Sequence, residues 1–120
     1  MRNKKVMVCD DDRGILDLIE LIMEDAGFLV ISEIDSLNAI SRIEKEKPDL
    51  LILDIWMPVL SGDQVLKSIK DSSRIVNLPV IMYSASTEGV GIAKAAGADD
   101  YIAKPFDLDE LIDKVNRLMV

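Results

Sequence analysis

Short apolar runs alternate along this chain with longer segments in which apolar and polar positions are mixed. Each run is bounded by polar or turn residues, and runs of this length and composition are typical of β-strands. Five strands are predicted, at residues 5–9, 28–32, 50–53, 79–83 and 101–103. The third run is continuously apolar, as expected for a strand that is covered on both faces of its sheet.

The segments between these runs repeat apolar residues every three or four positions, which predicts amphipathic helices. The first predicted helix covers residues 13–26 and is ended by Gly27, and the second is capped by Ser36 and closed by Pro48. The third is opened by the capping box Ser61–Gln64, and the fourth covers residues 88–96 and is ended by Gly97. The last helix runs from its cap, Asp107, to Leu118. The positions of the second helix that are expected to be buried are Leu37, Ala39, Ile40 and Ile43.

The alternation of strands and helices implies an α/β fold, with a parallel sheet covered by helices on both faces. The length of 120 residues is close to the commonest size of one domain, so a single domain over residues 1–120 is predicted. In folds of this class the functional site lies at the carboxyl ends of the strands, where the strand order reverses. The polar residues that follow the predicted strands are therefore the candidates for function.

Polar groups collect at the ends of four predicted strands. Asp10 and Asp11 follow the first strand, and Asp54 follows the third. Ser84 follows the fourth strand and Lys104 follows the fifth. Two carboxylates ~4 Å apart repel each other by roughly 4 kcal/mol at an effective dielectric constant of about 20. Crowding of these carboxylates at one edge of a sheet therefore predicts a bound cation that offsets the repulsion.

The chemistry of these groups suits a hard metal ion and a phosphoryl group. Oxygen ligands without histidine or cysteine favour Mg²⁺ over Ca²⁺. An aspartate beside Mg²⁺ can attack phosphorus and become an acyl phosphate, a transfer that depends mainly on positioning and charge neutralisation. Lys104 would supply a second cation, and the Ser84 hydroxyl would supply a hydrogen bond. Asp12 is interpreted mainly as the cap of the first helix.

Composition excludes several function classes. The formal net charge is −8 and no basic cluster exceeds Lys4-Lys5, which argues against nucleic-acid binding. The chain has no stretch of about 18 apolar residues and no signal-peptide core, so we expect no membrane association and a cytoplasmic location. Cys9 is the only cysteine, which excludes an internal disulfide, and it is interpreted as a buried strand residue.

Taken together, these motifs resemble the receiver domain of bacterial two-component response regulators. The resemblance covers residues 6–118 and rests on the acidic pair Asp10-Asp11, the segment 53–58 with Asp54 and with Gly62 eight residues later, the pair Ser84-Ala85, the aromatic Tyr101 and the sequence Lys104-Pro105-Phe106. It implies a three-layer α/β/α fold of the flavodoxin or CheY type. The middle layer would be a doubly wound (βα)5 parallel sheet of five strands in the order 2-1-3-4-5. It also implies a cis peptide bond before Pro105.

The resemblance implies a role for each acidic residue. Asp54 would be the phosphorylation site. Asp11 and Asp54, together with the backbone carbonyl of Trp56, would be direct ligands of Mg²⁺. Asp10 would act on the metal mostly through water.

The same resemblance implies how phosphorylation would change the surface of the domain. Lys104 would contact the phosphoryl oxygens, Ser84 would move towards them, and Tyr101 would turn inward. This change would reshape the face made by helix 88–96, strand 101–103 and the last helix. In the family that face often meets dimer partners or downstream targets, so a homodimer through it is one expectation. The phosphoryl donor would be a sensor histidine kinase or a phosphotransfer protein, and no separate substrate would be turned over.

Two alternative functions fit the sequence less well. A pseudo-receiver would act as a protein interaction module without phosphorylation, but such domains usually lack the acidic pair, the phosphoacceptor or the lysine, and all are present here. A phosphatase of the haloacid-dehalogenase type would need a second aspartate two residues after the nucleophile. This chain has Trp56 at that position.

Overall fold

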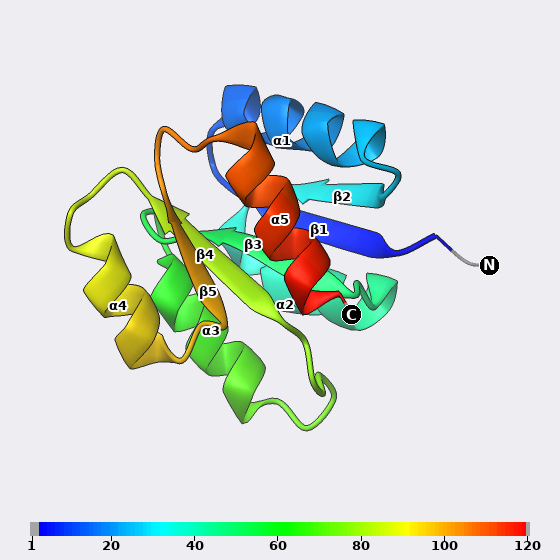
Figure 1. The fold of residues 1–120 in the computed structure, drawn as a ribbon. Coiled ribbons are helices and arrows are strands. Elements are labelled where there is room, and N and C mark those ends of the chain that lie inside the picture. Colours follow the sequence, from blue (N-terminus) through cyan, green and yellow to red (C-terminus); the bar gives the residue numbers. More distant parts are fainter. Residues whose placement is uncertain (1–2, 120) are drawn as a thin grey trace.

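The computed structural model describes residues 3–119 and contains one five-stranded sheet with helices on both faces (Figure 1). All neighbouring strands are parallel, and their order is β2-β1-β3-β4-β5. The strands are β1 (Lys5–Cys9), β2 (Leu29–Glu33), β3 (Leu50–Asp54), β4 (Val80–Ser84) and β5 (Asp100–Ala103). The predicted fold class and strand order are therefore confirmed. Residues 1–2 and 120 of the predicted domain lie outside the described residues.

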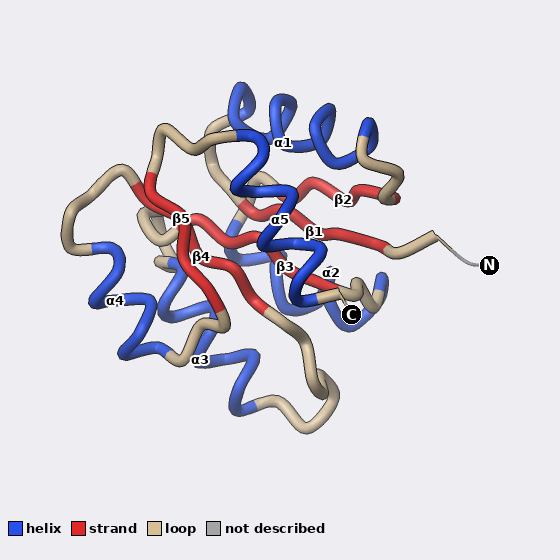
Figure 2. The backbone as a smooth tube through the Cα atoms, viewed as in Figure 1, coloured by secondary structure: helices blue, strands red, loops and turns tan. Residues whose placement is uncertain are grey.

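In residues 3–119, four helices and one 3₁₀ turn connect the strands, and a fifth helix follows the last strand. They are α1 (Arg13–Asp25), the 3₁₀ turn η1 (Ser36–Asn38), α2 (Ala39–Glu46), α3 (Gly62–Asp71), α4 (Gly89–Ala96) and α5 (Leu108–Leu118). Helices α1 and α5 cover one face of the sheet, and α2, α3 and α4 cover the other (Figure 2). Within residues 3–119, no helix combines the length and the apolar content needed to cross a membrane.

The sheet separates two apolar clusters. Alternate residues of a strand point to opposite faces, so Val6 and Val8 pack with residues of α1 and α5, while Met7 and Cys9 pack with residues of the other three helices. The central strands β3 and β4 are buried along their whole length, which explains their continuous apolar sequences. Burying each large apolar side chain contributes roughly 1.5–3 kcal/mol. The carboxyl ends of these strands are therefore anchored in a well-packed core.

The second helical segment begins differently from the prediction. Asp35, not Ser36, caps this segment, because its side chain accepts a hydrogen bond from the backbone N–H of Leu37 at the start of η1. The predicted capping role of Ser36 is wrong. Ser36 is buried, and its hydroxyl instead donates to the carbonyl oxygen of Pro58 at 3.0 Å. This hydrogen bond ties the segment to the loop that follows β3.

The 3₁₀ turn also changes which side chains are buried. Ala39 and Ile43 are buried and Ile40 is partly buried, as predicted, but Leu37 is 58% exposed. A 3₁₀ turn has about three residues per turn instead of 3.6, so the helical register is broken before α2 begins. Leu37 therefore does not lie on the buried face.

The other boundary signals are confirmed. Asp12 caps α1 and Asp107 caps α5 through backbone N–H groups of the first helical turns. Ser61 opens α3 with the predicted capping box. Gly27 follows α1 and Gly97 follows α4 in the left-handed region, at φ +97° and +86°.

Gly62 lets the loop after β3 pass close to the end of that strand. A Cβ atom at this position would overlap the backbone carbonyl of Asp54 and would lie 2.9 Å from the Cα of Ile55. The N–H of Gly62 donates to the carbonyl oxygen of Ile55 at 2.7 Å. Glycine is required for so close a backbone approach, which explains its position eight residues after Asp54.

Gly62→Ala is expected to destabilise the protein by more than about 2 kcal/mol, because its methyl group would have to displace backbone atoms. Gly91→Ala is the matched control. Gly91 lies in α4 with open space around its Cα, so this change should stabilise the protein by up to about 1 kcal/mol. Urea unfolding measures both effects. Equal free energies of unfolding for Gly62→Ala and the unchanged protein would contradict the close approach.

Candidate functional site

The carboxyl edge of the sheet brings the predicted polar residues together. Asp54 is the last residue of β3 and is paired with Tyr83 in the strand register. Asp10 and Lys104 directly follow β1 and β5, and Ser84 ends β4. The backbone N–H groups of Asp10 and Lys104 still donate to carbonyl groups of neighbouring strands, at 3.1 and 2.9 Å. Sheet hydrogen bonding therefore fixes the backbone from which these side chains project.

Three carboxylates converge at this edge. Ligand atoms of Asp10, Asp11 and Asp54 all lie within 4.8 Å of one another. Asp10 is fully buried and Asp54 is 4% exposed, whereas Asp11 is exposed. Buried carboxylates this close repel each other unless a cation compensates their charge. Hard divalent ions prefer such oxygen ligands, so the donor set fits a metal ion of this type.

Lys104 lies between the two buried carboxylates. Its Nζ is 3.4 Å from Oδ2 of Asp10 and 3.5 Å from Oδ1 of Asp54. These distances are long for hydrogen bonds. The ammonium group of Lys104 therefore forms two ion pairs of nearly equal length, one with each carboxylate. An ammonium group held in this way can shift towards new negative charge at either acceptor.

The environment of Asp54 changes its proton affinity. Burial, followed by the negative charge of Asp10, raises the pKa of the Asp54 carboxyl from 3.8 to about 7. The nearby Lys104 opposes this rise through its charge and its hydrogen bond, and the charge of Asp11 adds to it. Without a further cation, Asp54 therefore keeps its proton up to nearly neutral pH. A divalent cation would favour the ionised carboxylate, which is the nucleophilic form.

Ser84 and Tyr101 are brought together beside the start of α4. Ser84 is fully buried, and its hydroxyl oxygen accepts a hydrogen bond from the backbone N–H of Ser86 at 3.0 Å. The Tyr101 hydroxyl donates to the carbonyl oxygen of Ser84 at 3.2 Å. A Cβ atom on Gly89 would overlap this hydroxyl, so Gly89 provides the space that Tyr101 occupies. In residues 3–119, no hydrogen bond joins Ser84 to Asp54.

Three other predicted features lie near the site. Trp56 is 50% exposed in the loop after Asp54. The Lys104-Pro105 peptide bond is cis, as the resemblance implied. Cys9 is buried, and burial raises the pKa of its thiol to about 12. Its interpretation as a buried strand residue is confirmed.

Tyr83 is the site residue that sequence reasoning missed. Its hydroxyl donates to Oδ2 of Asp10 at 2.5 Å. The Nζ of Lys104 lies 4.5 Å from the centroid of its ring. One signal was present in the sequence, because Tyr83 is a hydroxyl-bearing residue in an otherwise apolar strand and directly precedes Ser84.

Comparison with known families identifies this arrangement. The sequence profile described as the response regulator receiver domain matches residues 6–116. The chain belongs to the response regulator receiver domain family. The matched residues of the receiver domain include all of the site residues described above.

Curated relatives include both long and short proteins. The alkaline phosphatase synthesis transcriptional regulatory protein PhoP of Bacillus subtilis (strain 168) is 34% identical over 119 residues, which cover 98% of this receiver domain and 49% of that protein. The sporulation initiation phosphotransferase F of the same organism is 29% identical over 119 residues, which cover 99% of this receiver domain and 96% of that protein. The chain spans about half the length of most of the curated relatives reported for it.

Solved structures share the receiver fold. A putative response regulator from Chloroflexus aurantiacus has a TM-score of 0.92 at 29% identity, with 98% of each chain covered. The chemotaxis response regulator CheY4 of Vibrio cholerae has a TM-score of 0.89 at 28% identity, with 98% of this chain and 99% of that chain covered.

Mg²⁺ is expected to change the fluorescence of Trp56, the only tryptophan, at micromolar to millimolar concentrations. The reason is that Trp56 lies two residues after Asp54 in the loop beside the carboxylates. Asp11→Asn removes one charged oxygen from the cluster, so it should move the titration to higher Mg²⁺ concentrations. A flat titration of the unchanged protein would count against the metal site.

The raised pKa of Asp54 predicts a pH dependence of stability in metal-free protein. Between pH 3.8 and about 7 the folded state binds more protons at Asp54 than the unfolded state does. Its contribution to stability is therefore present at low pH and is lost as the pH rises through this window. Asp54→Asn removes the titrating group, so its stability relative to the unchanged protein should increase from pH 4 to pH 7. Urea unfolding in EDTA measures this difference, and a difference that does not change with pH would contradict the pKa shift.

Proposed function

We propose that this receiver domain is the phosphoacceptor of a two-component relay. Asp54 takes a phosphoryl group from a sensor histidine kinase or a phosphotransfer protein in a reaction that requires Mg²⁺. The added charge then switches the face made by α4, β5 and α5. The observation that carries the proposal is the convergence of Asp54, a second buried carboxylate and Lys104 at one edge of the sheet.

The donor set supports a specific arrangement around the metal. Asp11 and Asp54, with the backbone carbonyl of Trp56, would hold Mg²⁺ directly. Asp10 would act mainly through water, because its Oδ1 already accepts from a backbone N–H at 2.9 Å and its Oδ2 accepts from the Tyr83 hydroxyl. When bound, the metal neutralises part of the negative charge on the phosphoryl oxygens.

The transfer itself needs little beyond positioning and charge. A carboxylate oxygen of Asp54 attacks phosphorus, and the bond from phosphorus to the donor's histidine nitrogen breaks with its electron pair leaving on that nitrogen. The product is an acyl phosphate on Asp54. Lys104, shared between Asp10 and Asp54 in the resting protein, follows the charge onto the phosphoryl oxygens. Water later attacks phosphorus and restores the carboxylate.

The structural effect of the added charge would pass to the surface through Ser84. Phosphorylation adds a charge of about −1.5 to −2, which attracts the Ser84 hydroxyl as well as Lys104. The carbonyl oxygen of Ser84 accepts from the Tyr101 hydroxyl, so a shift of this segment changes the position of Tyr101. Phosphorylation in this way biases an equilibrium between two arrangements of the α4 side.

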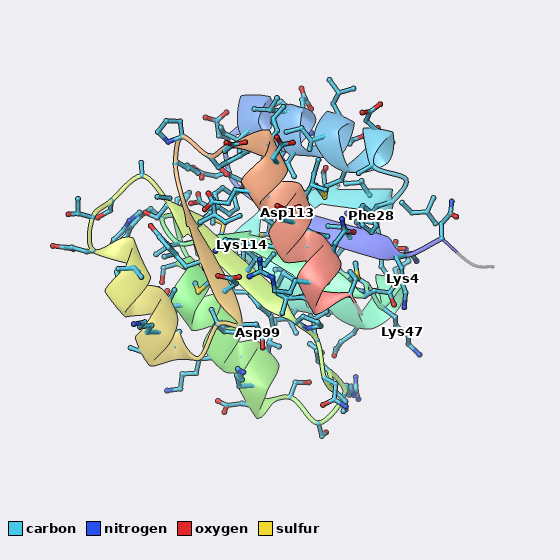
Figure 3. The ribbon with its side chains drawn as sticks, in the orientation of Figure 1. Lys4, Phe28, Lys47, Asp99, Asp113 and Lys114 are labelled. Atoms are coloured by element: carbon cyan, nitrogen blue, oxygen red, sulfur yellow. The ribbon has the colours of Figure 1, made fainter. Side chains whose placement is uncertain are left out.

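A partly buried ion pair joins two elements of the output face, α5 and β5. Lys114 on α5, labelled in Figure 3, donates to Oδ1 of Asp100 at 2.8 Å and to the carbonyl oxygen of Tyr101 at 3.1 Å. These contacts link α5 to β5, so Tyr101 and α5 would respond together. A second copy of the domain, joined through this face, is one output that the proposal includes. Direct binding of nucleic acid by this domain is not part of it, because the net charge is −8.

Incubation with acetyl phosphate and Mg²⁺ is expected to add one phosphoryl group to the protein, as measured by intact mass. Asp54→Asn and addition of EDTA should each abolish the gain, because they remove the nucleophile and the metal. Asp109→Asn changes an exposed aspartate of α5 and should leave the gain unaltered.

Other outcomes of this experiment would support different functions. No gain in the unchanged protein would contradict the proposal and favour a pseudo-receiver that acts as an interaction module. Continuous release of inorganic phosphate without a stable product would instead indicate a phosphatase.

A further inference from the structure

Tyr83 joins the apolar core to the charged edge of the sheet. Within residues 3–119 it is the largest fully buried side chain, at 1% exposure, and it directly precedes the last residue of β4. Its ring packs in the apolar cluster between the sheet and helices α1 and α5. A buried phenol needs a hydrogen-bond partner for its hydroxyl, and the partner here is a carboxylate of the site.

The hydroxyl of Tyr83 is one of three donors that contact the Asp10 carboxylate. Oδ1 of Asp10 accepts from the backbone N–H of Asp12 at 2.9 Å. Oδ2 accepts from the Tyr83 hydroxyl and also pairs with Lys104 at 3.4 Å. Burial, together with the charge of Asp10, raises the pKa of Tyr83, so the phenol remains a donor. Both oxygens of the Asp10 carboxylate are thus held in fixed directions.

The ring of Tyr83 has a second contact in the site. The Nζ of Lys104 lies 4.5 Å from its centroid, at cation–π distance. Phe106 packs against the same ring in a T-shaped arrangement, with centroids 6.2 Å apart and an interplanar angle of 85°. The phenol ring therefore contacts the Lys104 ammonium group, while its hydroxyl shares Oδ2 of Asp10 with that lysine. Because Asp10 does not depend on Lys104 alone, Lys104 stays available to Asp54.

We propose that Tyr83 is a positioning residue of the receiver site. Its hydroxyl fixes the orientation from which the Asp10 carboxylate acts on the metal, and its ring holds Lys104 between Asp10 and Asp54. The inference deepens the proposed function and rests on it where phosphoryl transfer is concerned. Residues that orient a metal site in this way usually matter nearly as much as the ligands themselves.

Tyr83→Phe tests the hydroxyl alone, since it keeps the ring, the contact with Lys104 and the packing against Phe106. The Mg²⁺ affinity, measured by titration of Trp56 fluorescence, should fall about tenfold. Ser32→Ala is the matched control, because the Ser32 hydroxyl also donates to a carboxylate, that of Glu20, at 3.1 Å. Its Mg²⁺ affinity should stay within about twofold of the unchanged protein. Thermal unfolding without Mg²⁺ verifies that each variant is folded at the titration temperature.

A double-mutant cycle with Asp10→Asn separates positioning from a general effect on the fold. If Tyr83 acts through the Asp10 carboxylate, Tyr83→Phe should weaken Mg²⁺ binding little further when Asp10→Asn is already present. The same tenfold loss in both backgrounds would overturn the proposal, because the effect would then not pass through Asp10. The proposal would also be overturned if Tyr83→Phe alone bound Mg²⁺ with the same affinity as the unchanged protein.

Two measurements on the same proteins distinguish a failure of the role of Tyr83 from a failure of the proposed function. The gain of a phosphoryl group from acetyl phosphate is measured in the unchanged protein. If that protein binds Mg²⁺ but gains no phosphoryl group, the proposed function fails, and the cycle of Mg²⁺ affinities still decides the role of Tyr83. If it gains the group but Tyr83→Phe binds Mg²⁺ equally well, only the role of Tyr83 fails.

Discussion

The repulsion between two buried carboxylates is the constraint on which the rest of this structure depends. Asp10 and Asp54 lie at the ends of adjacent strands, and the sheet does not let them move apart. A proton, Lys104 or a metal ion can offset the charge of these carboxylates, and each of these leaves a distinct chemical state. A phosphoryl group on Asp54 would add more negative charge to the same place. The site is therefore a place where a small chemical change has a large electrostatic effect.

The two sides of the sheet surround this constraint differently. On the side of α1 and α5, Tyr83 packs in the core and contacts both Asp10 and Lys104. On the side of α4, Tyr101 is joined to the segment after β4 by hydrogen bonds to backbone carbonyls and occupies space left by a glycine. In the proposed function, the first side would preserve the geometry of the carboxylates, while the second would rearrange. A switch requires both properties, since the surface must change while the site stays intact.

Most of the fold and the charged part of the site could be predicted because they depend on local pattern. The apolar run ending at Asp54 and the position of Lys104 after a short strand are enough to place both at one sheet edge. Tertiary contacts decide the rest. Tyr83 looks like a core residue until its hydroxyl is found beside Asp10, and Ser36 looks like a cap until it is found bonded to the loop after β3. Val59 adopts φ +70°, a conformation disfavoured for a β-branched residue, and only the surrounding fold imposes it.

Chemical mapping of the phosphorylated residue tests the central claim most directly. The protein would be treated with acetyl phosphate and Mg²⁺ and then reduced with borohydride, which converts an aspartyl phosphate into homoserine, and its peptides would be sequenced by mass spectrometry. Homoserine is expected at position 54 and at no other aspartate of the cluster. Homoserine at Asp10 or Asp11, or phosphate recovered on a hydroxyl residue instead, would contradict it.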